Sequence, residues 1–229
     1  MLVPYKFTYF VISIALMVPW VILFVQKKRP RKEMLTISSL AAALSIITSY
    51  LFWTKDWWRP ETITGTIVGI EDLILGFAVG GIVTIVYERV FKRRYAKYEG
   101  DTYYSQIIPY IAGTFALLAL LFWATPLTSF YSMVVAILAV SSIIFYQRRD
   151  LIKNGIVSAF FMTALFLPYY YAIMIISPGW IERTYLFDTL SGTMIIGIPL
   201  EELVFWFLFG LWWGPYYEFW KKRKKNENI

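Results

Sequence analysis

The chain has 229 residues, of which 59% are hydrophobic, and its mean hydropathy is +0.58. Soluble domains have an apolar share of only about 45–50%, so this composition excludes an ordinary water-soluble fold. The sequence contains no cysteine and no histidine, which excludes disulfides, thiolate metal sites and an imidazole proton shuttle. The net charge of +7 does not indicate nucleic-acid binding, because the basic residues gather at the ends of apolar segments, as membrane topology requires.

Apolar segments long enough to cross a membrane recur along the chain. One helical span needs roughly 20 mostly apolar residues, and we predict an all-α polytopic membrane protein with about seven transmembrane helices. The first segment lacks a small-residue cleavage site and is followed by a basic run, so it is predicted as a span rather than a signal peptide. The predicted spans cover residues 5–25, 34–53, 66–91, 107–123, 127–146, 151–176 and 191–220.

The basic residues lie mainly on one side of the predicted spans. Loops after odd-numbered spans carry runs such as 27–32 and 92–97, and the tail carries 221–225, whereas loops after even-numbered spans carry only Lys55, Arg59 and Arg183. The positive-inside rule therefore predicts an outer N-terminus and a cytoplasmic C-terminus, with the plasma membrane as the expected location.

The third predicted span recurs in the seventh at a constant offset. This offset indicates an internal duplication in one membrane domain, with parallel three-helix repeats at 1–98 and 127–229 joined by a connector helix at 99–126. The matched residues are Ile70, Glu71, Asp72, Leu73, Phe77, Gly80 and Glu88 with Leu200, Glu201, Glu202, Leu203, Phe207, Gly210 and Glu218.

The chemically notable feature of both repeats is a pair of adjacent acids, Glu71-Asp72 and Glu201-Glu202. The predicted spans place each pair five to ten residues inside the membrane, in its outer half. Ionised carboxylates are costly in hydrocarbon, so we expect the acids to face the bundle interior and to mark a functional site. Four acids near one cavity cannot all be charged, so a proton donor and a proton acceptor would coexist there.

Two other interpretations of the acids come from their neighbours. The pairs could bind Arg59 or Arg183 and simply hold the outer loops. Glu88 and Glu218 also match across the repeat, but each lies beside a cation, Arg89 or Lys221, and they are interpreted as interfacial ion pairs.

Aromatic residues near the acids offer π faces that can stabilise a developing cation, above all Phe77, Phe205 and Phe207. Trp57 and Trp58 in the outer loop are candidate substrate contacts, although an interfacial aromatic belt is the favoured interpretation of the tryptophans in the outer loops.

The glycines of the third span, Gly76, Gly80 and Gly81, predict close helix approach. No dinucleotide fingerprint follows a strand, so no FAD or NAD cofactor is expected.

The acid pairs carry a family resemblance. The segment Pro199-Leu200-Glu201-Glu202-Leu203-Val204-Phe205 resembles the Pro-x-Glu-(Glu/Asp) signature of the membrane-intrinsic lycopene cyclases. Gly69-Ile70-Glu71-Asp72-Leu73 is its counterpart, with glycine where the pattern has proline. The loop 53–60 is also similar, and the resemblance spans nearly the whole chain.

This resemblance implies that lycopene, a polyene dissolved in the membrane lipid, is cyclised to β-carotene-type rings without net redox change or a cofactor. A neutral carboxylic acid would protonate the terminal double bond, and a carboxylate would remove a proton after ring closure. We expect Glu71 and Glu201 to face the cavity, with Asp72 and Glu202 supporting them or exchanging roles. Because both halves are fused, a monomer could suffice.

Rival functions remain for seven spans with buried acids. A rhodopsin needs a membrane-embedded lysine, and residues 154–220 contain none. A non-catalytic carotenoid-binding protein and a proton-coupled transporter stay open, because acids inside spans serve both.

Overall fold

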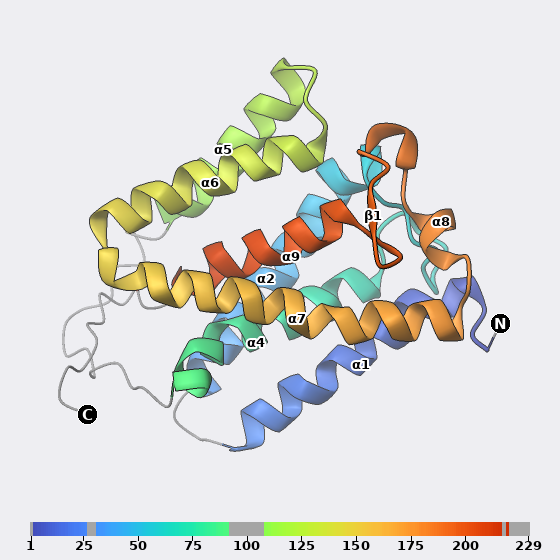
Figure 1. Ribbon diagram of the computed structural model, residues 1–229, viewed down its shortest axis with the longest axis horizontal. Coiled ribbons are helices and arrows are strands. Elements are labelled where there is room, and N and C mark those ends of the chain that lie inside the picture. Colours follow the sequence, from blue (N-terminus) through green and yellow to red (C-terminus); the bar gives the residue numbers. More distant parts are fainter. Residues whose placement is uncertain (1, 27–30, 92–107, 217–218, 220–229) are drawn as a thin grey trace. The chain divides into compact units, whose positions relative to one another are not determined.

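The structure is a computed structural model that describes residues 2–26, 31–91, 108–216 and 219, with only the backbone described for 86–91. It is all-α apart from one short hairpin (Figure 1). The helices are α1 Tyr5–Gln26, α2 Arg31–Thr48, α3 Thr54–Asp56, α4 Ile70–Phe91, α5 Ile108–Ala124, α6 Ser129–Gln147, α7 Ile152–Ile176, α8 Trp180–Thr184 and α9 Leu200–Trp213. Single turns of other types cover Ser49–Trp53 (π), Arg149–Leu151 and Phe187–Thr189 (both 3₁₀), and the strands are β1 Met194–Ile195 and β2 Ile198–Pro199.

Several helices are long and apolar enough to cross a membrane. They are Tyr5–Gln26, the continuous stretch Arg31–Asp56, Ser129–Gln147 and Arg149–Ile176, and Ile108–Ala124 is a shorter apolar helix. Spans of this length and composition make the chain a membrane protein. The cationic runs at 27–30, 92–97 and 221–225 lie outside the described residues, as do Glu218 and the side chains of Glu88 and Arg89.

The chain divides into two compact units. Unit 1 comprises Met1–Ile82 with Ala164–Val204, and unit 2 comprises Val83–Thr163 with Phe205–Ile229. Within unit 1, α8 and the β1-β2 hairpin lie at the end where the chain begins (Figure 1).

Glycines allow close helix packing in each unit. In unit 1, a Cβ at Gly76 would lie 2.8 Å from the Ala41 carbonyl oxygen, and one at Gly80 would lie 3.0 Å from that of Ile37. In unit 2, a Cβ at Gly210 would lie 2.6 Å from the Ala159 Cα. Real Cβ atoms do not pack this closely to backbone, so the predicted role of the glycines of α4 in close helix approach is confirmed.

The predicted starts of the helices carrying the acids are too early. The third predicted span begins at 66 and the seventh at 191, whereas α4 begins at Ile70 and α9 at Leu200. Residues 194–199 instead form an antiparallel hairpin, whose turn residues Ile196 and Gly197 have φ of 51° and 82°. Positive φ at both central positions is typical of a two-residue hairpin turn, although a β-branched residue rarely adopts it. The acids therefore lie in the first turns of their helices, not five to ten residues inside.

Candidate active site

The two acid pairs occupy matching positions in unit 1. Glu71 and Asp72 lie in the first turn of α4, and Glu201 and Glu202 lie in the first turn of α9. Exposure is 0% for Glu71, 4% for Asp72, 2% for Glu201 and 6% for Glu202. The free amides of a helix N-terminus favour negative charge nearby. The fold thus buries four carboxyl groups at positions where helix ends reduce the cost of doing so.

The first acid of each pair is held in the same way. Glu71 Oε1 accepts the backbone N–H of Ile63 at 2.7 Å, and Glu201 Oε1 accepts that of Ser191, also at 2.7 Å. In the described part of the chain, Oε2 of Glu71 and Oε2 of Glu201 are buried and have no hydrogen-bond partner. Burying a carboxyl oxygen without a donor is costly, so these two oxygens are unusual for groups with a purely structural role.

Asp72 receives three hydrogen bonds. Its Oδ1 accepts the hydroxyls of Ser49 at 2.7 Å and Tyr9 at 3.1 Å, and its Oδ2 accepts the Gly69 N–H at 3.0 Å. Gly69 precedes α4, so the last bond is the return half of a capping box. The π-helical turn that begins at Ser49 is part of this arrangement, in keeping with the frequent occurrence of such turns at functional sites.

Glu202 has a different environment. It occupies the same helix position as Asp72, but the residue before α9 is Pro199, which has no N–H to donate. Instead, Glu202 Oε2 accepts the hydroxyl of Tyr170 from α7. Tyr170 in turn shares a hydrogen bond of 3.2 Å with Tyr185, which follows α8. Burial, and next the charge of Glu202, raise the pKa of Tyr185 well above its ordinary value, so its hydroxyl keeps its proton.

A chain of four aromatic residues, Tyr9, Trp58, Tyr185 and Tyr170, joins the second acids of the two pairs. We call it the aromatic bridge. The rings of Tyr9 and Trp58 meet edge to face at 5.1 Å, and those of Trp58 and Tyr185 stack at 6.3 Å. Tyr9 also lies within electrostatic range of Glu71 and Glu202. Both pairs are therefore linked through side chains of unit 1.

The two loops that contain Trp58 and Tyr185 are paired through their backbones. Trp58 and Tyr185 form an antiparallel bridge. The Arg59 N–H donates to the Thr184 carbonyl at 2.8 Å, and the Leu186 N–H donates to the Trp57 carbonyl at 2.8 Å. Backbone pairing fixes the loops without relying on surface side chains, and it holds Trp58 and Tyr185 in the aromatic bridge.

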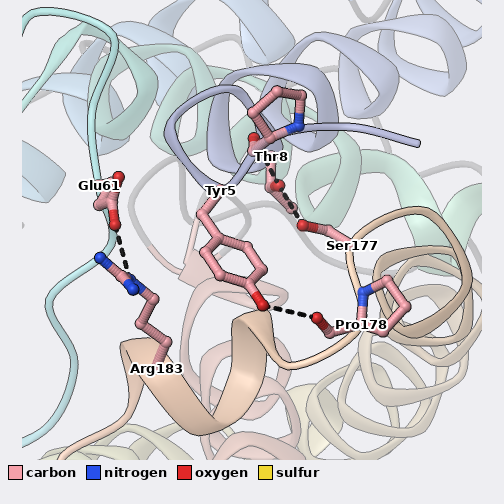
Figure 2. A network of polar contacts seen from close by, with 7 residues as sticks. Tyr5, Thr8, Glu61, Ser177, Pro178 and Arg183 are labelled. Carbon is pink, nitrogen blue, oxygen red and sulfur yellow. Dashed lines mark hydrogen bonds and ion pairs between the residues drawn. The ribbon is translucent and has the colours of Figure 1, made fainter. Parts of the chain in front are cut away.

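Arg59 and Arg183 contact groups other than the four acids. Arg183 forms an ion pair of 2.7 Å with Glu61, and its guanidinium lies 5.3 Å from the centre of the Tyr5 ring (Figure 2). Arg59 donates to the backbone carbonyls of Thr54 and Lys55. The interpretation in which Arg59 or Arg183 neutralises the acid pairs therefore does not match these contacts. A cavity of about 160 Å³ in this region is lined by Tyr5, Arg59, Glu61, Trp180, Arg183 and Thr184.

The structure places the predicted tryptophans inside the protein. Trp57 and Trp180 are both 3% exposed, and Trp57 packs against Trp53 at 5.4 Å. Side chains this buried do not form a lipid-facing belt. Trp58 is half-buried in the aromatic bridge.

The three predicted phenylalanines lie in both units. Phe77 packs against Trp20 at 5.1 Å in unit 1. In unit 2, Phe205 packs against Trp206 at 4.8 Å, and Phe207 meets Phe160 at 5.3 Å.

Sequence reasoning missed the residues that support the acids: Tyr9, Ser49, Tyr170 and Tyr185. With neither histidine nor cysteine present, tyrosine was one of the few side chains left for proton chemistry. The chain has 17 tyrosines, however, and no pattern distinguishes these three from the rest. Their partners are 63 and 32 residues away along the chain for Tyr9 and Tyr170, so only the fold brings them together.

The apolar helices and the buried carboxyl groups define an α-helical membrane protein with a carboxylic-acid site. A protein-family model described as lycopene cyclase matches residues 5–90 and 128–220, well over half of the chain. The chain therefore belongs to the lycopene cyclase family, as the acid signatures predicted. It is an enzyme of carotenoid biosynthesis with a carotenoid substrate. Comparisons with curated proteins and with solved structures gave no match.

Proposed function

We propose that this enzyme is an intramembrane lycopene β-cyclase that uses acid–base catalysis and no redox cofactor. The observation that carries the proposal is the twin geometry of Glu71 and Glu201. Each is buried in the first turn of its helix, with one oxygen held by a backbone amide and the other without a hydrogen-bond partner among the described residues. Such an oxygen can carry a proton and offer it to an alkene in a site that excludes water.

The proposed reaction conserves protons and electrons. The neutral acid transfers its proton to the terminal double bond of lycopene, which leaves a tertiary cation. The π electrons of the neighbouring double bond then form the new carbon–carbon bond and close a six-membered ring, which moves the cation onto the ring. A carboxylate removes a proton from the ring carbon beside the polyene, and the β-type ring double bond forms. One proton is added and one is removed, so no oxidant or reductant is needed.

We assign the cavity-facing roles to Glu71 and Glu201. Asp72 and Glu202 support them or exchange roles with them, because both accept hydrogen bonds that stabilise a carboxylate. The cation would develop among aromatic faces, where π electrons stabilise positive charge. Trp58 is the best placed, since it lies between two tyrosines that belong to the site. Trp57, Phe77, Phe205 and Phe207 are proposed as further contacts along the polyene.

The proposal includes the membrane architecture. Two parallel three-helix repeats, 1–98 and 127–229, would be joined by a connector at 99–126, giving seven spans with an outer N-terminus in the plasma membrane. The family model supports this division, because its two matched segments each contain one acid pair. Gly80 of α4 and Gly210 of α9 each pack against the second helix of their own half. Lycopene would reach the site sideways from the lipid, and a monomer would suffice.

Pigment analysis tests the proposal directly. Lycopene-accumulating cells that express the chain are expected to produce β-carotene-type pigment, separated and identified by chromatography and absorption spectra. Glu201→Gln should abolish cyclisation, because an amide has no proton to give. Glu182→Gln, an exposed residue of α8, is the matched control and should cyclise normally.

The alternatives predict different outcomes. A carotenoid-binding protein would co-purify with unchanged lycopene, and a proton-coupled transporter would leave lycopene unchanged without binding it. Well-inserted protein that yields only lycopene would reject the proposed function in favour of one of these.

A further inference from the structure

The hydroxyls of Tyr9 and Tyr170 point at the second acids of the two pairs. Tyr9 is 3% exposed and Tyr170 is 5% exposed. Tyr9 donates to Asp72 at 3.1 Å, and Tyr170 donates to Glu202. Buried tyrosine hydroxyls generally have a polar partner, but here both partners are acids of one site, reached from different helices.

We propose that Tyr9 and Tyr170 are positioning residues that fix the orientation of the Asp72 and Glu202 carboxyl groups for proton transfer. This inference rests on the proposed function. A carboxyl group rotates about its last bond, and a fixed phenol that donates to one oxygen restricts that rotation. The second oxygen is then held in one direction relative to the substrate, and a small misplacement of a catalytic group is costly.

Asp72 and Glu202 are held by different sets of hydrogen bonds. Asp72 also accepts bonds from Ser49 and from the Gly69 amide, so the loss of Tyr9 leaves two donors. Glu202 accepts the hydroxyl of Tyr170, which also shares a hydrogen bond with Tyr185. Tyr9 is one of three donors to its acid, so its loss should have a modest effect.

The test uses the full-length protein in detergent micelles containing lycopene. Tyr170→Phe should lower kcat about ten- to a hundredfold, the worth of a hydrogen bond to a charged group, with KM unchanged within about twofold. Tyr9→Phe should lower kcat by about three- to tenfold. Tyr169→Phe, which removes the neighbouring hydroxyl that donates to the Ala15 carbonyl, is the matched control on α7 and should leave kcat unchanged.

Infrared spectroscopy measures the frequency of the carboxyl band, which general destabilisation of the protein would not shift. The carboxyl band lost in Glu202→Gln identifies Glu202, and that band should shift in Tyr170→Phe and stay in place in Tyr169→Phe. If Tyr170→Phe does not fold, Tyr185→Phe carries the test, because Tyr185 hydrogen-bonds to Tyr170 and also interacts with Glu202. It should shift the same band by a smaller amount.

An unshifted Glu202 band together with wild-type kcat in Tyr170→Phe would overturn the inference, as would an unshifted band in Tyr185→Phe where only that variant folds. A fall in kcat with a rise in KM and no band shift would also overturn it, by assigning Tyr170 to substrate binding. Failure of the proposed function is distinct, because the well-inserted wild-type protein would then leave lycopene unchanged.

Discussion

The two acid pairs share the environment of their first acid and differ in that of the second. Glu71 and Glu201 each take one amide hydrogen bond from the loop before the helix. Asp72 accepts the Gly69 amide, whereas Glu202 follows Pro199 and accepts the hydroxyl of Tyr170. The first acid, with one oxygen held by an amide, is the feature that the two pairs share. The support around it differs, which suggests a division of labour between the pairs.

The structure gives a steric reason for glycine, rather than proline, at position 69 of the first signature. A Cβ at this position would lie 2.8 Å from Thr62 Cγ2 and would collide with Glu71 Oε2. Glycine therefore leaves room for the carboxyl group of Glu71 and supplies the amide for Asp72.

The largest expected effect tests the equivalence of the first acids. Glu71→Gln and Glu201→Gln should each lower cyclisation about 10²–10⁴-fold, the usual range for a lost general acid or base. Turnover of lycopene in micelles, measured by chromatography, gives the ratio. Equivalence fails if one variant stays within about threefold of wild type while the other is inactive.

Exchanging the capping residues sharpens the difference between the pairs. Gly69→Pro removes the amide bound to Asp72 and places a ring against Glu71, so cyclisation should fall by more than about tenfold and the melting temperature should drop. Pro199→Gly adds an amide that Glu202 can accept, and it should keep activity within about threefold. Equal losses in the two variants would show that the cap does not distinguish the pairs.

A smaller effect is expected from one donor to Asp72. Ser49→Ala removes one of three hydrogen bonds and should cost about 1–3 kcal/mol of stability, with a loss of cyclisation of about two- to tenfold. Ser45→Ala, one helical turn earlier, removes a hydroxyl that donates to the Asp72 backbone carbonyl at 2.7 Å and not to its carboxylate. Thermal melts and turnover assays in which Ser45→Ala loses more stability and more cyclisation than Ser49→Ala would contradict the role given to the Asp72 carboxylate.

The smallest effect on stability and cyclisation is expected from a substitution of Arg183. Arg183→Gln breaks its ion pair with Glu61, whose side chains are 62% and 42% exposed, and should change stability by less than about 1 kcal/mol. Cyclisation should be unchanged, because the site acids are held by amides and hydroxyls. Loss of activity in Arg183→Gln but not in Glu61→Gln would instead mean that Arg183 serves the acid pairs.

The sequence predicted the helices and the four acids better than it predicted their surroundings. Apolar length placed α1 and α7 to within one residue at each end, since hydrophobicity alone defines such spans. It failed at α9, because residues 191–199 are apolar enough to extend the span while their glycines favour a turn. Glu71 and Glu201 stood out because charge inside a span is rare. Tyr170 and Ser49 did not, because a hydroxyl among apolar residues is ordinary until the fold shows what it faces.

The pairing of the loops that contain Trp58 and Tyr185 has a consequence for the synthesis of the protein. Trp58 and Tyr185 come from distant parts of the chain, and Glu61 and Arg183 are 122 residues apart. The ribosome must synthesise the chain as far as Tyr185 and Arg183 before these partners exist together. The loop pairing can therefore form only after the first acid pair, Glu71 and Asp72, has been made.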